Sequence, residues 1–163
     1  MRIATALAFA GLLASPALGA CPEGSANILS CTLSAGGKAV SACWRDETAS
    51  YAFGRPGAAP ELTIETPLTE AGYRPWNGIG GSIYEEVTFA NRGVSYTVWA
   101  AMERNQEANP LSGGILVTRD GAEIAALKCD PGSVETGFGA LFERMEQLGR
   151  CWDYGEHAWK DCH

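Results

Sequence analysis

The chain has 163 residues and a formal net charge of −7 with its histidines neutral. This length is enough for one domain with its own core. The charge has the wrong sign for binding nucleic acid or an anionic membrane surface. It suits a cationic partner, and it equally suits a protein that simply stays in solution. After the N-terminal region, no stretch is long and apolar enough to predict a membrane span.

Residues 1–20 have the organisation of a secretory signal peptide. Arg2 provides a positive start, an apolar run follows over residues 3–14, and small residues precede Cys21. We therefore expect a periplasmic or secreted protein whose mature chain, residues 21–163, forms a single domain. The four residues that end at Cys21 also resemble a lipobox. Cleavage there would make the protein a lipoprotein anchored through the lipid on that cysteine.

An even number of cysteines in a secreted chain indicates a disulfide framework. The six are Cys21, Cys31, Cys43, Cys129, Cys151 and Cys162. Lipidation of Cys21 would leave one of them unpaired, so the count favours the soluble form. We expect Cys151–Cys162 to close the tail and Cys31–Cys129 to join the first and last strands, which leaves Cys21–Cys43. Because Cys31 and Cys43 lie symmetrically about a hairpin turn, a bond between those two is the alternative.

Eight segments have the apolar and polar alternation of antiparallel strands. They cover residues 27–34, 38–45, 50–54, 61–65, 82–90, 94–102, 113–118 and 122–129. Turn signals such as Asn91-Arg92-Gly93 and Asp120-Gly121 separate the later ones. The pattern predicts a mainly all-β fold, a small eight-stranded antiparallel barrel or sandwich. Closure of a barrel would bring the first and last strands together.

The C-terminal part predicts one α-helix, over residues 134–149, followed by a disulfide-closed tail, residues 150–163. Apolar residues repeat there at helical spacing, at Phe138, Leu141, Phe142, Met145 and Leu148. Thr136 is the expected N-cap, and Gly149 is the residue expected to end the helix. Closure of the tail by its own disulfide would contribute about 2–3 kcal/mol.

The most distinctive stretch is residues 72–84, a loop rich in glycine, proline and aromatic residues that runs into a strand. Large aromatic side chains of this kind dominate binding hot spots. The candidate binding residues are Tyr73, Trp76, Ser82, Tyr84 and Glu86. The alternative is that the aromatic residues plug the open end of a barrel. Binding surface and plug both remain open from the sequence.

The sequence contains none of the motifs G-x-S-x-G, H-E-x-x-H or C-x-x-C, and no cofactor is expected. Asp161-Cys162-His163 offers residue types that bind metals, but a disulfide beside a terminal histidine is the simpler interpretation, so no metal site is predicted. Glu85 falls on the apolar face of its strand. Burial there would raise its pKa and suit it to general-acid catalysis. Pairing with an arginine, or exposure through a bulge, is the alternative.

Several short motifs resemble a family of uncharacterised secreted proteobacterial proteins. They are Cys31…Cys43, Tyr51-x-Phe53-Gly54, Pro60-Glu61-Leu62, Glu86-Val87-Thr88-Phe89 and Tyr96-x-Val98, before a last strand that ends at Cys129. The layout is also distantly similar to the bacterial periplasmic lysozyme inhibitors, which are secreted, disulfide-bonded, eight-stranded antiparallel proteins. Some of these insert a Ser-Gly-x-x-Tyr-like loop into the lysozyme active site, and Gly81-Ser82-Ile83-Tyr84 is a rearranged form of that motif. The C-terminal helix and tail are additions to that layout.

These features support three hypotheses about function. The first is a non-enzymatic periplasmic binding or inhibitor-type protein whose 72–84 loop contacts a cationic protein such as a lysozyme. The second is a carboxylate-dependent hydrolase of envelope glycan or peptide, with Glu85 or Glu86 as the acid. The third is a structural envelope protein in which the loop aromatics are buried. The sequence leaves the ligand and the oligomeric state open.

Overall fold

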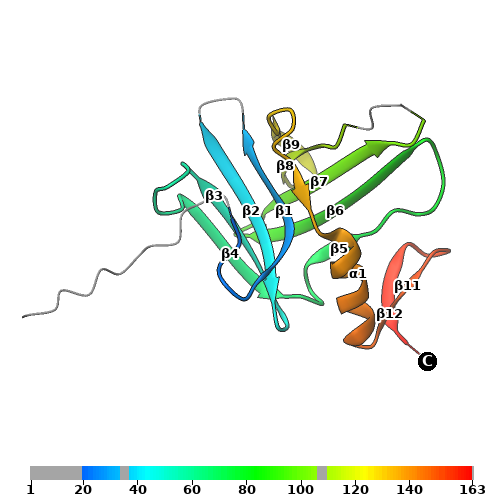
Figure 1. Cartoon of the computed structure of the whole chain (residues 1–163). Helices are drawn as coiled ribbons and strands as arrows, with labels where there is room; N and C mark the ends of the chain where they lie inside the picture. The colour runs from blue at the N-terminus through cyan, green and yellow to red at the C-terminus, as the bar shows by residue number, and fades with distance from the viewer. Residues whose placement is uncertain (1–19, 34–36, 106–109, 163) are drawn as a thin grey trace, which may run out of the picture.

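The computed structural model describes residues 20–33, 37–105 and 110–162, which form two antiparallel sheets, one helix and a small C-terminal hairpin (Figure 1). The first sheet has the strand order β10-β1-β2-β3-β4, and the second has the order β5-β6-β7-β8-β9. Strands β11 and β12 form the hairpin at the C-terminal end. The expected leader, apart from Ala20, lies outside the described residues.

Most strands are joined to the next by a tight turn, so neighbours in the chain are neighbours in the sheet. In chain order they are β1 (Ala26–Leu33), β2 (Lys38–Arg45), β3 (Thr48–Gly54), β4 (Leu62–Pro67), β5 (Gly72–Arg74), β6 (Ser82–Asn91), β7 (Val94–Glu103), β8 (Ser112–Arg119), β9 (Ala122–Lys128), β10 (Glu135–Thr136), β11 (Arg150–Asp153) and β12 (Ala158–Asp161). The helix α1 (Phe138–Gln147) lies between β10 and β11. All eight predicted strands are present with similar bounds. The four strands that the sequence did not predict, β5, β10, β11 and β12, have two to four residues each.

The sheets are not closed into a barrel, so of the two predicted arrangements, barrel or sandwich, the structure shows the sandwich-like one. A barrel would have paired β1 with β9. Instead β10 pairs with the free edge of β1, with Leu29 opposite Thr136 and Ser30 opposite Glu135. Backbone pairing between β1 and the chain just after β9 is limited to one isolated bridge, Leu33 opposite Cys129, and the Cys31–Cys129 disulfide links the same two segments covalently.

Apolar side chains from both sheets and from α1 form one core. The largest fully buried side chains include Ile28, Leu29, Tyr51, Phe89, Ile115, Leu141 and Met145. Tyr51 joins the two sheets, since its ring centroid lies 5.6 Å from that of Phe89 and 5.6 Å from that of Tyr96. Burial of each such side chain stabilises the fold by about 1.5–3 kcal/mol.

Helix α1 begins later than predicted and without a side-chain cap. Its N-cap is Gly137, not Thr136. A Cβ at Gly137 would lie 2.2 Å from the carbonyl oxygen of Asn27, so the chain passes too close to β1 for any other residue. Thr136 belongs to β10 instead, where its hydroxyl donates to the carbonyl of Ile28 at 3.2 Å. The prediction that Gly149 ends the helix is confirmed by its φ of +76°.

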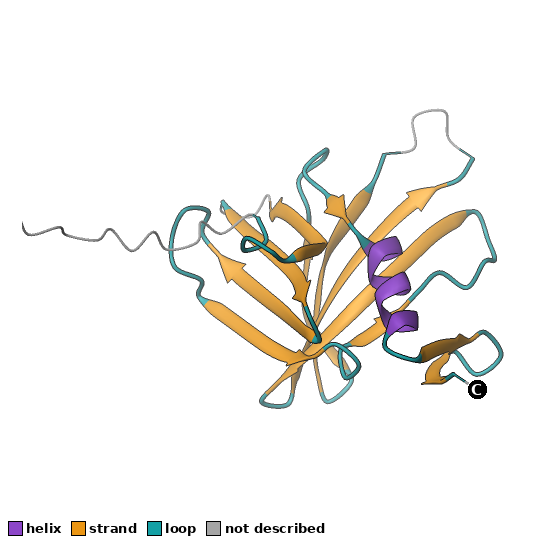
Figure 2. Cartoon of the chain, turned by 60° about the horizontal axis from the view of Figure 1, so that its bottom comes forward, coloured by secondary structure: helices purple, strands orange, loops and turns teal. Residues whose placement is uncertain are grey.

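The hairpin β11–β12 packs beside α1 at the end where the chain stops (Figure 2). Trp159 makes the main contact. Its ring lies 5.2 Å from Phe142 on the helix and 5.6 Å from Tyr73 on β5, and its indole N–H donates to the carbonyl of Tyr73 at 2.8 Å. In the hairpin turn, hydrogen bonds from Lys160 and from turn amides lower the pKa of Asp153 to about 2. No helix in the described ranges has the length and apolar character needed to cross a membrane.

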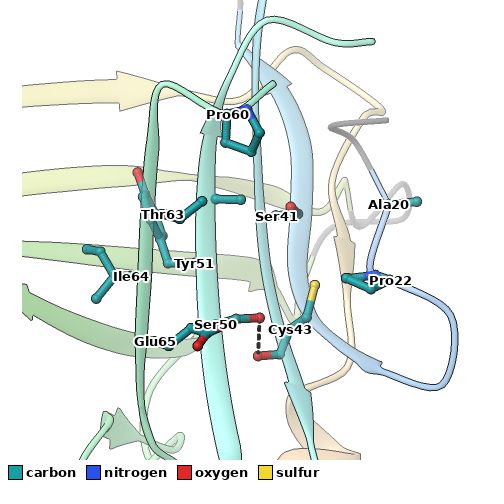
Figure 3. Close-up of a pocket in the computed structure, with 11 residues that line it drawn as sticks. Ala20, Pro22, Ser41, Cys43, Ser50, Tyr51, Pro60, Thr63, Ile64 and Glu65 are labelled. Carbon is teal, nitrogen blue, oxygen red and sulfur yellow. Dashed lines mark hydrogen bonds between the residues drawn. The ribbon is translucent and has the colours of Figure 1, made fainter. Parts of the chain in front are cut away.

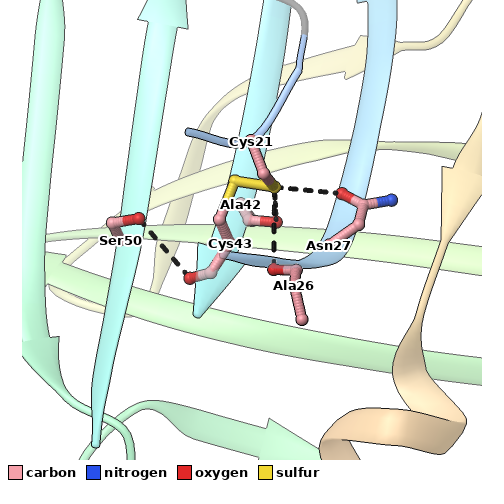
Figure 4. Close-up of a disulfide and its surroundings, with 6 residues drawn as sticks. All are labelled: Cys21, Ala26, Asn27, Ala42, Cys43 and Ser50. Carbon is pink, nitrogen blue, oxygen red and sulfur yellow. Dashed lines mark hydrogen bonds between the residues drawn. A yellow bond between two sulfur atoms is a disulfide. The ribbon is translucent and has the colours of Figure 1, made fainter. Parts of the chain in front are cut away.

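The three expected disulfides are confirmed as Cys21–Cys43, Cys31–Cys129 and Cys151–Cys162. Cys31–Cys129 ties β1 to the end of β9 and so fastens one sheet to the other. Cys21–Cys43 holds the segment before β1 against β2 (Figure 4). The Sγ of Cys21 lies 3.6 Å from the carbonyl of Ala26, which is a packing contact because a disulfide sulfur carries no hydrogen.

Loss of the inter-sheet disulfide is expected to destabilise the protein more than loss of the tail disulfide. Chain-entropy arithmetic gives about 4–5 kcal/mol for the sequence separation of 98 residues in Cys31–Cys129 and about 3 kcal/mol for the 11 residues in Cys151–Cys162. Denaturant unfolding of the two double cysteine-to-alanine variants measures both values. An equal or larger loss for the tail pair would contradict the assignment of Cys31–Cys129 as the main tie between the sheets.

Candidate binding site

The distinctive loop is a hairpin connection, because residues 72–74 form β5 and pair with β6. Tyr73 lies opposite Val87, and Arg74 lies opposite Glu86. The part outside the sheet is therefore residues 75–81. Two of its glycines, Gly78 and Gly80, have φ angles of +80° and +96°, which other residues rarely adopt.

Hydrogen bonds within the loop hold its tip in one shape. The indole N–H of Trp76 donates to the carbonyl of Ile79 at 3.1 Å. The backbone N–H of Ile79 donates to the Asn77 side-chain oxygen at 3.0 Å, an interaction that closes a small turn. Both polar groups of Ile79 are thus used locally, while its side chain is 76% exposed.

Arg104, which directly follows β7, supports the loop from the side. Its backbone N–H donates to the carbonyl of Gly81 at 2.8 Å, and its Nη1 donates to the carbonyl of Gly80 at 3.4 Å. Its guanidinium also lies over the Trp76 ring, 5.0 Å from the centroid, at a distance typical of cation–π contacts. These contacts tie the loop to the end of the sheet.

Glu85 lies on the inner side of β6, as the alternation predicted, and it is partly buried. Its carboxylate accepts a hydrogen bond from the Tyr73 hydroxyl at 3.0 Å and another from the backbone N–H of Trp76. Burial raises the pKa of Glu85, and the two hydrogen bonds partly oppose that rise. The Glu85 carboxylate therefore holds the backbone of the loop at its second residue, Trp76.

On the outer side of β6, Tyr84 and Glu86 form a second cluster with β5 and β7. The Tyr84 hydroxyl donates to Glu86 Oε2 at 2.8 Å, and Arg74 Nη1 donates to Glu86 Oε1 at 3.2 Å. The Tyr84 ring stacks on Trp99, with centroids 6.0 Å apart and an interplanar angle of 20°. Burial and the Glu86 hydrogen bond raise the pKa of Tyr84, so its hydroxyl stays protonated as a donor.

The structure brings most of the predicted binding residues to one face. A surface pocket of about 450 Å³ contains Trp76, Ser82 and Tyr84 together with Arg74, Asn77 and His157. Glu86 lines the adjoining pocket of about 430 Å³, between β5 and the tail hairpin. Tyr73 differs, because it is only 3% exposed and packs between Phe138 and Trp159. For Tyr73 the burial alternative is therefore the observed one, and its side chain is not available to a partner.

Sequence reasoning missed Arg74, Trp99, Arg104 and His157. Cross-strand pairing with Glu86 would have indicated the first two, since Glu86 lies opposite Arg74 on one side and opposite Trp99 on the other. Arg104 and His157 reach the loop from the end of β7 and from the tail turn. No local sequence pattern indicates that Arg104 and His157 lie near the loop.

A different pocket, of about 250 Å³, lies on the outer face of β2, β3 and β4 (Figure 3). Small neutral side chains such as Ser41, Ser50 and Thr63 line it, and Pro60 and Pro22 flank it. Among the described residues that line it, Glu65 is the one carboxylate. These residues form no recognisable catalytic or ligand-binding arrangement.

Metal chemistry at the C-terminus is not supported by the geometry. Cys162 is bonded to Cys151, so it has no thiolate to offer a metal, and His163 lies outside the described residues. Within residues 20–33, 37–105 and 110–162, no three His, Cys, Asp or Glu side chains are placed to hold a metal ion.

Comparison of the chain with protein-family models, with curated proteins and with solved structures finds no match.

Replacement of Glu85 tests whether burial makes the charged form of its carboxylate unfavourable in the folded protein. A raised folded-state pKa means that stability falls as the pH rises from about 4.5 through the folded pKa. Glu85→Gln keeps an acceptor for Tyr73 and Trp76 without the charge. We expect it to be at least as stable as the wild type at neutral pH and to converge with it below about 4.5. Thermal unfolding across this range, with the exposed Glu123→Gln as control, measures the difference.

An opposite trend would contradict this account of Glu85. If Glu85→Gln became progressively less stable than the wild type as the pH rises, the charged carboxylate would be the favoured form. The hydrogen bonds from Tyr73 and Trp76 would then outweigh the cost of burial.

Proposed function

We propose that this protein is a non-enzymatic periplasmic or secreted binding protein of the inhibitor type. In this proposal it inserts the loop of residues 75–82 into a concave site on a cationic protein such as a lysozyme. The observation that carries the proposal is the shape of the tip. An isoleucine that is 76% exposed is held outward by hydrogen bonds that satisfy its own backbone.

Exposure of a large apolar side chain at a fixed loop tip favours partner binding. The exposed large hydrophobic residues of the described chain are Ile79, Tyr84, Ile124 and Tyr154, and Ile79 is the most exposed of them. A loop that is already ordered loses little conformational entropy when it docks, so more of the contact energy becomes affinity. The contacts of Asn77 and Arg104 with the loop support this pre-organisation.

The charge distribution favours a cationic partner. The chain carries a net charge of −7, while residues 75–82 contain no charged side chain. Long-range attraction from the acidic protein would increase the rate of encounter with a basic partner. The uncharged loop would then enter an apolar or polar cleft without burying an unpaired charge.

Three disulfides are compatible with an oxidising compartment outside the cytoplasm. A disulfide and a lipid thioether cannot share one sulfur. The bond between Cys21 and Cys43 therefore favours the soluble form over the lipoprotein alternative. The predicted signal peptide supports the same location.

Two features favour a lysozyme as the first partner to test. One is the distant similarity to the periplasmic lysozyme inhibitors. These are secreted, disulfide-bonded, antiparallel β-proteins, and some of them insert a loop into the lysozyme active site. Lysozymes are also commonly basic and have a deep cleft. The hydrolase alternative gains less support, because Glu85 is engaged by Tyr73 and Trp76, and Glu86 is engaged by Arg74 and Tyr84.

The test is retention of the protein on a panel of immobilised lysozymes from different structural classes, together with a cell-wall lysis assay. We expect at least one lysozyme to be bound and inhibited. Ile79→Asp should weaken binding at least about tenfold, because a charge at a buried hot spot costs about 2 kcal/mol or more. Ile124→Asp is the matched control on β9, where the isoleucine is 53% exposed, and it should bind like the wild type.

Two results would count against this function. One is an absence of retention on every lysozyme together with full lytic activity at a molar excess of the protein. The other is equal weakening by Ile79→Asp and Ile124→Asp, which would mean that the loop tip is not the contact.

A further inference from the structure

A pair of stacked aromatic side chains lies beside the loop, on the outer face of the second sheet. Tyr84 on β6 and Trp99 on β7 stack with centroids 6.0 Å apart and planes 20° from parallel. Both belong to the outer side, since Trp99 lies opposite Glu86, two residues along the strand from Tyr84. Tyr84 is 39% exposed and Trp99 is partly exposed, so the pair is accessible from solvent.

Gly114 on β8 allows the Trp99 ring to lie over the sheet. It is the residue directly opposite Trp99. A Cβ at this position would lie 3.1 Å from two atoms of the Trp99 indole and 2.3 Å from the carbonyl of Leu127. Any other residue would push the ring away from the sheet. The glycine thus lets the aromatic surface spread across three strands.

A salt bridge and two neutral polar side chains lie around this surface. Glu86 accepts from the Tyr84 hydroxyl at 2.8 Å and from Arg74 at 3.2 Å, so the carboxylate is neutralised by a guanidinium. The Arg74 side chain is 64% exposed and keeps further N–H donors for a ligand. Asn77 and Ser82, in the pocket that Tyr84 also lines, add an amide and a hydroxyl.

We propose that the Tyr84–Trp99 surface binds a neutral pyranose unit of a glycan chain. A sugar ring has an apolar C–H face that matches the negative face of an aromatic ring, and it has hydroxyls that both donate and accept hydrogen bonds. The paired Glu86 and Arg74 give no net attraction to either sign of charge, which disfavours a charged ligand. Nucleobases, which also stack on aromatic rings, come with phosphates that the net charge of −7 repels.

The inference is independent of the proposed protein partner. The two stacked rings lie on the sheet face, whereas the partner-binding tip is Ile79, which lines the same pocket as Tyr84. If the role of the Tyr84–Trp99 pair is purely structural, the pair stabilises the fold by about 0.5–1.5 kcal/mol and binds no ligand. Binding measurements separate these two possibilities.

The experiment is calorimetric and NMR titration of the full mature chain with four tetrasaccharides. Three are neutral, namely the β-1,4-linked tetramers of N-acetylglucosamine and of glucose and the α-1,4-linked tetramer of glucose. The fourth, tetragalacturonate, is charged. We expect at least one neutral tetramer to bind with a dissociation constant in the micromolar to millimolar range and to shift the indole N–H resonance of Trp99.

Matched variants locate the binding. Tyr84→Ala should weaken it at least about tenfold, whereas Tyr84→Phe, which keeps the ring, should retain most of it. Ile124→Asp should not change it, and neither should Tyr154→Ala, which removes another exposed aromatic side chain. Near-UV circular dichroism of each variant checks that the fold is kept.

The inference is overturned if no neutral tetramer binds at millimolar concentration. Tighter binding of tetragalacturonate than of every neutral tetramer would also overturn it, and so would equal binding by Tyr84→Ala and the wild type.

Discussion

The structure depends on the packing and hydrogen bonding of one buried tyrosine, Tyr73. Its ring stacks against Phe138 of the helix and Trp159 of the tail hairpin. Its hydroxyl lies 3.0 Å from the Glu85 carboxylate and 3.2 Å from the carbonyl of Phe138, and its own carbonyl accepts from the Trp159 indole. The second sheet, the helix and the tail therefore meet at one residue. Because Glu85 also holds the backbone of Trp76, the shape of the loop is coupled to this packing.

The strands that the sequence predicted are the long ones, in which alternation continues over enough residues to be recognised. The short strands could not be found this way. The two-residue β10 is one example, because it occupies the edge of β1 that a barrel would have paired with β9. The even cysteine count predicted that all six cysteines pair, but it left the connectivity open. The expected pair Cys31–Cys129 came from the meeting of the first and last strands, and it is present although the sheets do not close into a barrel.

The candidate site was predicted only in part. Residue type alone indicated Trp76, Ser82, Tyr84 and Glu86, which the fold brings to one face. Tyr73 has the same residue type as Tyr84 but the opposite environment. The two lie on different strands and on different sides of the sheet. Arg104 supports the loop and His157 lines its pocket through tertiary proximity, which no local sequence pattern indicates. The shape of the loop thus depends on tertiary packing more than on a local sequence motif.

The proposed function requires a loop tip that is ordered before any partner binds. The most direct measurement is the ¹⁵N relaxation order parameter of the Ile79 amide in the free protein. The hydrogen bond from that amide to Asn77 predicts an order parameter of about 0.85, like that of the neighbouring strands. A value below about 0.6 would show a flexible tip and would contradict the account.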